Sequence, residues 1–334
     1  MLVTLKGLFT AQAIAETFTA LPDLQTTVLD TAFPDRPTHP FAAVAKSELT
    51  ETTGTVPVVG RTGQPFNIGN DELEIETVAP CPIKPSINVT AAELNDLKMI
   101  MGGASVETWK RAKIDRLRRL VRETTEAMAS IVLYTGKVNW PYRDNGGNMR
   151  QYVVDYGQPH SYTPAQKLTP DSKPSQLFTI LVDMGTAIRN AGIGGNVTFH
   201  CGKSVFAVLM DMVDSRVSTA ASTGGMRMEL SRDKQNVVQL GGYEIMLMNE
   251  TYKDPLTNRH VEKINDKALI GFATDAKGKV WYCALDSISA GNAAVPFHIV
   301  PETIRGDVGI ELIAQSKPLP ARNSKATCTA IVVD

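Results

Sequence analysis

The segment "VETWKRAKIDRLRRLVRETTEAM", residues 106–128, carries seven Lys or Arg residues and one acid, Asp115, between positions 110 and 122. That part has a net charge of +6, whereas the whole 334-residue chain has a formal net charge of −1. The spacing of its apolar residues predicts one long amphipathic helix, which starts after an N-cap at Ser105 and stops at Gly136. The expected apolar stripe is Val106, Trp109, Lys113, Leu117, Leu120, Thr124, Met128 and Ile131.

Three interpretations of this basic helix are open. It is a solvated charged face, a helix that grips nucleic acid, or a helix that pairs with acids on other copies of the same chain. A DNA-reading helix normally comes with a compact helical module or a basic arm, and the sequence offers neither. Aromatic side chains for stacking on single-stranded bases are limited to Trp109 and Tyr134.

Upstream of the helix, two extended runs at residues 55–68 and 72–80 predict a long β-hairpin. Each arm would span roughly 40 Å, which is long for a hairpin held only by its own domain. The hairpin is therefore expected to project. It carries acids at Asp71, Glu72, Glu74 and Glu76, opposite in sign to the helix. Opposite charges on two projecting elements suit a self-assembling subunit.

The N-terminal residues resemble a secretory signal, but a helical stripe favours a short amphipathic arm. That stripe consists of Leu8, Ala11, Ile14, Phe18 and Leu21. The proline-rich segment 33–41 cannot form a helix and suits a central strand poorly. No apolar run reaches the ~18 residues that a membrane helix needs.

The second half of the chain predicts a small α/β unit. We expect a hairpin at 137–157 with an Asn145–Gly146 turn, a helix at 174–191 closed by Gly192, a buried strand at 196–201 and a helix at 203–213. A strand pair at 236–249 should follow a flexible polar segment at 214–234. Residues 267–285 read as a hairpin that turns at Lys277–Gly278, followed by two extended runs.

The sequence shows no pattern of catalytic, cofactor-binding or metal-binding residues, which favours a non-enzymatic protein. Gly202-Lys203-Ser204 ends like a phosphate-binding loop, but Val197 stands where that motif needs glycine, so Ser204 is expected to cap a helix. The five histidines lack zinc-ligand spacing. The four cysteines, Cys81, Cys201, Cys283 and Cys328, predict reduced and mostly buried thiols.

Several of these segments, and the order in which they follow one another along the chain, resemble the major capsid proteins of tailed phages, in the family typified by the lambda coat protein. "AQSKPLP" at 314–320 is similar to a segment near the C-terminus of that family, and "VTFHCGKSVFAVLMDM" at 197–212 is similar to its strand-to-helix passage. The resemblance implies an α+β fold of the Hong Kong 97 coat type. It divides the chain into an N-terminal arm (1–45), an extended loop (46–90), the spine helix with the first part of the peripheral domain (91–160), an axial domain (161–265) and the rest of the peripheral domain (266–334).

The resemblance implies a subunit that forms the pentamers and hexamers of an icosahedral phage head around double-stranded DNA, bound without sequence specificity. A separate scaffolding protein, a portal and, as in lambda-type members, a decoration protein are the expected partners, and assembly is expected in the bacterial host cytoplasm. Covalent crosslinking is the minor alternative. The expected assembly interface is Arg61, Asp71, Glu72, Glu74, Glu76, Arg116, Arg119 and Arg122.

Two other functions stay open. An encapsulin-like compartment would share the fold and enclose enzymes, and a basic-helix protein would bind nucleic acid in a salt-dependent manner. If Arg116, Arg119 and Arg122 pair with neighbouring copies, we expect their reversal to Glu to leave the monomer folded and to prevent assembly.

Overall fold

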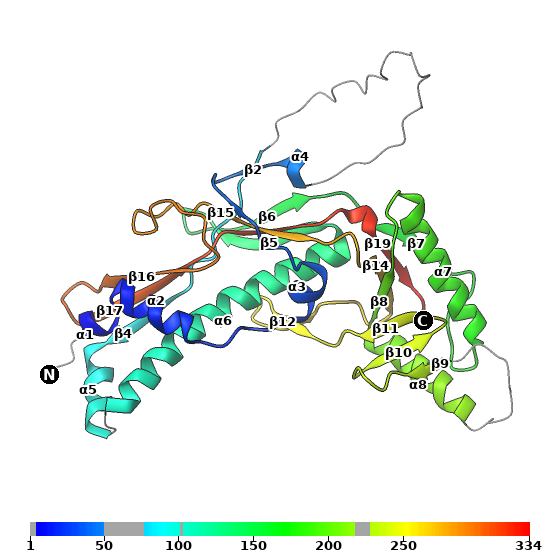
Figure 1. Ribbon diagram of the computed structural model, residues 1–334, viewed down its shortest axis with the longest axis horizontal. Coiled ribbons are helices and arrows are strands. Elements are labelled where there is room, and N and C mark those ends of the chain that lie inside the picture. Colours follow the sequence, from blue (N-terminus) through cyan, green and yellow to red (C-terminus); the bar gives the residue numbers. More distant parts are fainter. Residues whose placement is uncertain (1–4, 50–76, 101–102, 218–227) are drawn as a thin grey trace, which may run out of the picture. The chain divides into compact units, whose positions relative to one another are not determined.

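The computed structural model describes residues 5–49, 77–100, 103–217 and 228–334, which belong to two compact units. Unit 1 comprises Met1–Val44, Thr77–Met128 and Lys279–Pro320. Unit 2 comprises Ala45–Glu76, Ala129–Gly278 and Ala321–Asp334. Figure 1 shows the elements of both. The predicted division into five consecutive segments stays a prediction, because each of these units collects residues from three separate stretches.

The basic segment forms one helix, α6 (Gly103–Thr135), as predicted. It ends where expected, because Gly136 has φ +74° and its N–H donates to Val132 O at 2.9 Å. It begins three residues earlier than predicted, so Ser105 lies inside the helix and is not its N-cap.

The predicted apolar stripe of α6 is wrong at several positions. Leu120 is 39% exposed, and Trp109 and Lys113 are only half-buried. The buried line instead contains two cations, Lys110 and Arg118. Periodicity missed them because it treats Lys and Arg as exposed, whereas their long aliphatic stems can be buried when the charged ends find partners. The buried line of α6 consists of Val106, Lys110, Ile114, Leu117, Arg118, Val121 and Thr125.

The core of unit 1 lies under an antiparallel sheet of β16 (His298–Thr303), β17 (Gly309–Gln315) and β4 (Ser86–Thr90). Ile310 and Leu312 on this sheet pack with Ile114 and Leu117 of α6. Figure 1 shows α1 (Leu5–Leu8) and α2 (Ala11–Thr19) beside the sheet, and Phe9 enters the same cluster.

The predicted helical arm is confirmed over Ala11–Thr19, but its stripe is interrupted between α1 and α2, and not every residue of the stripe is buried. Leu8, Ile14 and Leu21 pack against the core of unit 1, while Ala11 is exposed. Phe18 stacks on Phe297 with ring centroids 5.1 Å apart. The helix begins at Thr10, whose hydroxyl accepts from Ala13 N at 3.2 Å.

A second sheet of unit 1 contains β1 (Thr38–His39), β15 (Lys279–Cys283) and β18 (Pro318–Ala321), in that order. The edge strand β1 comes from the proline-rich segment, which agrees with the prediction that this segment suits a central strand poorly. His39 contacts Trp281 edge to face, with ring centroids 5.9 Å apart.

Unit 2 is built on a seven-stranded sheet in the order β7-β19-β14-β8-β11-β10-β9. The strands are β7 (His160–Tyr162), β8 (Val197–Cys201), β9 (Met228–Leu230), β10 (Val237–Leu240), β11 (Tyr243–Leu247), β14 (Ala268–Ala273) and β19 (Thr327–Ile331). Helices α7 (Pro174–Asn190) and α8 (Lys203–Val217) pack in one hydrophobic cluster with Phe199 and Leu269. The predicted helices and strands of this region are confirmed, but α8 begins at Lys203, so Ser204 lies within its first turn.

The predicted hairpin at 267–285 is wrong. β14 pairs with β8 and β19, whereas β15 belongs to the β1-β15-β18 sheet. All six residues of β14 are buried, because both of its faces are covered. Gly271 is required there, since a Cβ would lie 2.6 Å from the ring of Phe199.

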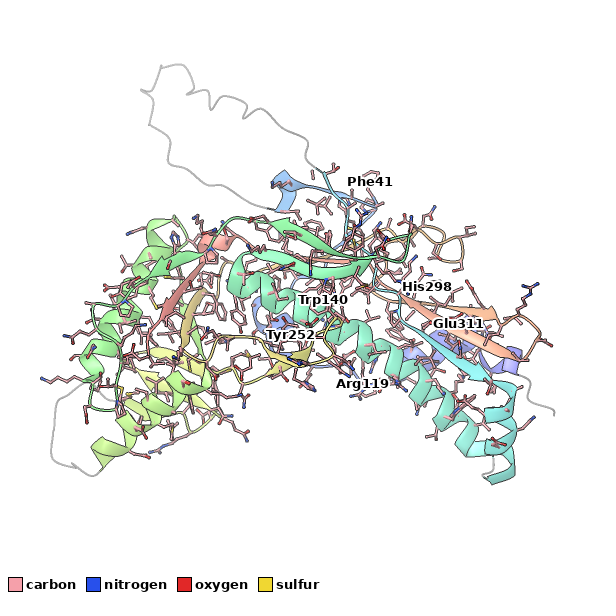
Figure 2. All side chains as sticks on the ribbon, turned by 180° about the vertical axis from the view of Figure 1, so that it is seen from behind. Phe41, Arg119, Trp140, Tyr252, His298 and Glu311 are labelled. Carbon is pink, nitrogen blue, oxygen red and sulfur yellow. The ribbon has the colours of Figure 1, made fainter. Side chains whose placement is uncertain are left out.

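Two ribbons complete the strands of unit 2. β5 (Lys137–Arg143) and β6 (Met149–Asp155) form the predicted hairpin, and β12 (Thr251–Lys253) pairs with β13 (His260–Glu262). Figure 2 shows Trp140 and Tyr252, whose ring centroids are 5.7 Å apart, at the contact between the ribbons.

The remaining elements are short. They are α3 (Thr27–Ala32), α4 (Lys46–Leu49), α5 (Ala91–Ile100), β2 (Val44–Ala45), β3 (Thr77–Val78) and the 3-10 turn η1 (Ser324–Ala326). Most of the predicted projecting hairpin, at 55–76, lies outside the described residues. The polar segment predicted as flexible at 214–234 begins within α8 and contains β9, and its middle also lies outside the described residues.

All four cysteines are free, and all but Cys81 are buried. Burial raises the pKa of the Cys201 thiol to about 12 and those of Cys283 and Cys328 to about 11. In the described part of the chain, no helix is both long and apolar enough to cross a membrane.

His200 is buried on the face of the seven-stranded sheet opposite to Phe199. Its Nδ1 lies 2.9 Å from the Tyr134 hydroxyl, and its ring meets Phe272 edge to face. Burial lowers the pKa of His200 to about 3. The folded protein therefore keeps this imidazole neutral at pH values where an unfolded chain would protonate it.

We expect His200 to make the subunit acid-sensitive. Because its folded pKa is depressed, its contribution to stability is complete above the unfolded pKa of about 6.5 and declines towards pH 3, by up to ~1.4 kcal/mol per pH unit. His200→Gln keeps a hydrogen-bonding group but cannot titrate. It should make the free energy of unfolding, measured by urea denaturation, less dependent on pH between pH 6 and 4. The exposed His260→Gln is the control, and equal slopes for both variants would contradict the prediction.

Candidate assembly interface

Asp115 binds two of the cations of α6. Its carboxylate accepts from Arg118 at 2.9 Å and from Arg119 at 2.7 Å, one helical turn away. Burial alone would raise the pKa of Asp115, but the hydrogen bonds and charges of Arg119 and Arg118 outweigh it and hold that pKa below its ordinary value. Arg118 also donates to Pro22 O at 2.7 Å, so this pair anchors the N-terminal arm.

Arg122 connects α6 to the N-terminal arm at a second point. Its guanidinium donates to the Thr26 hydroxyl and to the Asp30 carboxylate, both at 2.7 Å, and Arg36 also pairs with Asp30. Burial would raise the pKa of Asp30, but the Thr26 N–H and the two guanidinium groups hold it below its usual range. Asp30 therefore stays ionised and continues to hold Arg122.

Glu126 makes a third tie, one turn further along α6. Its two carboxylate oxygens accept from the N–H groups of Val28 and Leu29, at 2.9 and 2.8 Å. These N–H groups belong to the first turn of α3, where a helix has donors without internal partners. Thr26, the N-cap residue of α3, makes no side-chain capping bond, so a carboxylate distant in sequence performs this role.

Two lysines of the segment are also paired within the chain. Lys110 lies 3.2 Å from Glu107, and Lys113 lies 3.3 Å from Glu93 of α5. Five of the seven cations thus bind carboxylates of the same chain, and Arg111 and Arg116 are exposed. Most of the positive charges of this helix are therefore used in ion pairs within its own unit.

Among the predicted interface residues on α6, Arg116 is exposed and Arg119 has a side chain that is 59% exposed. Arg122 differs, because its side chain is only 13% exposed and bonded to the arm. Arg61, Asp71, Glu72, Glu74 and Glu76 lie outside the described residues.

Sequence reasoning missed Asp30, Glu126 and Arg118, which do most of the binding around α6. The spacing of Asp115 with Arg118 and Arg119 could have indicated the first pair. Nothing in the local sequence could have linked Arg122 to Asp30, which is 92 residues away.

Between the arm and α6 lies a groove of 840 Å³ in unit 1. Phe18, Val121 and Phe297 give it apolar walls, and Arg118 and Arg122 reach its surface. Among the described residues, no group of three His, Cys, Asp or Glu side chains could hold a metal ion.

The chain belongs to the phage major capsid protein E family, whose model matches residues 10–332. The family predicted from the sequence is confirmed. The protein is therefore a coat protein, which forms the shell of a phage head from copies of itself and is part of the virion.

Solved structures support the same fold. A protein from a prophage of E. coli CFT073, assigned as a capsid protein, superposes with a TM-score of 0.65 at 17% identity, over 96% of this chain and 98% of that chain. A phage-related protein of Bordetella bronchiseptica RB50 superposes with a TM-score of 0.52 at 12% identity, over 96% and 95%. The predicted α+β coat fold is thus confirmed. No curated protein sequence matches the chain significantly.

We expect Arg122→Glu to loosen the N-terminal arm, because it places a second carboxylate beside Asp30. The free energy of unfolding should fall by about 1–3 kcal/mol. Urea denaturation measures this change, and protease cleavage between residues 20 and 36 should become faster. This replaces the sequence-based expectation that reversal of Arg122 leaves the fold intact.

Arg116→Glu is the matched control, since it makes the same charge change on an exposed position of the same helix. Equal stability and equal cleavage rates for the two variants would show that the tie to Asp30 does not hold the arm.

Proposed function

We propose that this coat protein assembles into pentamers and hexamers that close an icosahedral head around double-stranded DNA. The observation that carries the proposal is the family match over residues 10–332, combined with a unit 1 whose long helix leaves Arg116 and Arg119 exposed. A shell repeats each contact in every subunit, so contacts that are weak alone can decide whether it closes.

The interface that we propose joins Arg116 and Arg119 to acids of neighbouring copies. Asp71, Glu72, Glu74 and Glu76, with Arg61 on the same segment, are the proposed counterparts. Arg122 is left out of this set, because its side chain is only 13% exposed and is bound by Asp30 and Thr26 of its own chain.

Membership of the family also supports proposals about the activity, the place of assembly and the partners of the protein. We propose that the protein has no enzymatic activity or cofactor, that it assembles in the host cytoplasm with a scaffolding protein and a portal, and that a decoration protein binds the finished shell. An encapsulin-like compartment remains the alternative of the same fold. Non-specific contact with packaged DNA is secondary, because five of the seven cations of the basic segment are paired within the chain.

The double variant Arg116→Glu/Arg119→Glu tests this proposal. Expressed with its scaffolding protein, the wild type should form closed shells of pentameric and hexameric capsomers in negative-stain micrographs. The variant should keep its circular dichroism spectrum and fail to assemble, because two attractive contacts become repulsive at every interface.

The assay is done without DNA, at low and high salt. Normal empty shells from the variant would reject the pairing and favour the DNA-binding interpretation. A wild-type protein that stays monomeric under all conditions would reject the shell itself.

A further inference from the structure

The β16–β17–β4 sheet of unit 1 has an outer face, whose side chains point away from the hydrophobic core. Along β17, Ile310, Leu312 and Ala314 are buried in the cluster with α6, so Glu311 and Ile313 point to the other side. On β16 the same alternation buries Ile299 and leaves Val300 and Glu302 on the outer face.

The register places like charges opposite each other on this outer face. Glu302 pairs with Glu311, and Val300 pairs with Ile313 in the next row. Two carboxylates in direct cross-strand opposition destabilise a sheet. Asn88, the partner of Glu311 on β4, carries no charge that could offset this repulsion.

The exposed face of α6 has the complementary chemistry. Leu120 is 39% exposed, while Leu117 and Val121 beside it face the core. Arg116 lies one turn before Leu120 and is exposed. An arginine and a leucine about 6 Å apart on the helix therefore match a glutamate and an isoleucine that are about 7 Å apart on β17.

A single chain cannot join these two faces, because they lie on opposite sides of one core. Ile114 and Leu117 of α6 and Leu312 of β17 fill the space between them. Figure 2 marks the two elements with Arg119 on α6 and Glu311 on the sheet. The complementary surfaces can meet only between two copies, and such a head-to-tail contact builds rings when its rotation closes.

We propose that the Arg116–Leu120 face of α6 docks on the outer face of the β16–β17–β4 sheet of a neighbouring copy, with Arg116 beside Glu311 and Leu120 against Val300 and Ile313. The inference rests on the proposed self-assembly and assigns Arg116 to the sheet of the neighbouring copy, in place of the partner proposed for it within residues 71–76. It also gives the opposed glutamates a role, since a cation from the neighbour relieves their repulsion.

Charge exchange tests the contact. Arg116→Glu and Glu311→Arg should each raise the protein concentration needed for assembly by at least about tenfold, as seen by light scattering. The double variant should assemble again, because the pair is restored with its signs reversed. A 1:1 mixture of the two single variants should form rings of six but not of five, since the variants must alternate around the ring for every helix to meet a compatible sheet.

The Glu311→Arg subunit should unfold at an equal or higher urea concentration than the wild type, because the new arginine lies opposite Glu302. This unfolding measurement distinguishes the loss of the contact between copies from the loss of the fold. If Glu311→Arg does not fold, Glu311→Gln replaces it and should weaken assembly less. Arg111→Glu, about 140° around the helix from Arg116, and the exposed Asp171→Arg of unit 2 are the matched charge controls.

Unimpaired assembly of either single variant would overturn this contact while leaving the shell function intact. Rescue of Arg116→Glu by Glu74→Arg but not by Glu311→Arg would also overturn it, and would assign Arg116 to residues 71–76. A wild-type protein that never assembles would reject the proposed function, a result distinct from both.

Discussion

Neutralisation of α6 by carboxylates of its own chain is the constraint on which unit 1 depends. Lys110 and Arg118 are buried, and a buried cation without a partner would be costly. Glu107 pairs with Lys110 and Asp115 pairs with Arg118. Asp30 and Glu126 bind the N-terminal arm to the same helix. The sheet and the helix can then share one apolar core although the helix carries a net positive charge.

This arrangement also sorts the charges into two groups. Cations with buried or half-buried side chains stabilise the subunit, whereas the exposed Arg111, Arg116 and Arg119 remain at the surface for other contacts. A change of salt or pH acts differently on the two groups, because exposed pairs are screened more strongly than half-buried ones. Subunit stability and shell stability can therefore vary independently in this protein.

Local patterns predicted most of the elements. The end of α6 at Gly136, the β5–β6 hairpin and the α7–β8–α8 order each follow from a turn residue or from periodicity within a short window. Three kinds of prediction failed or were missed. The buried stripe of α6 was misplaced because buried cations look exposed in a pattern of apolar residues. The hairpin at 267–285 was wrong because β14 pairs with strands that are distant in sequence. The tie between Arg122 and Asp30 was missed because it joins residues 92 positions apart.

The interleaving of the chain between the two units has a consequence for biosynthesis. Strand β19 lies between β7 and β14 in the large sheet, and β17 lies at the centre of the sheet that covers α6. Neither unit has its full set of strands until the ribosome has added residues from the last tenth of the sequence. Long-range pairing of this kind slows folding. A nascent chain thus cannot present a finished assembly surface, and new subunits become competent to join a shell only after β17 and β19 have been synthesised.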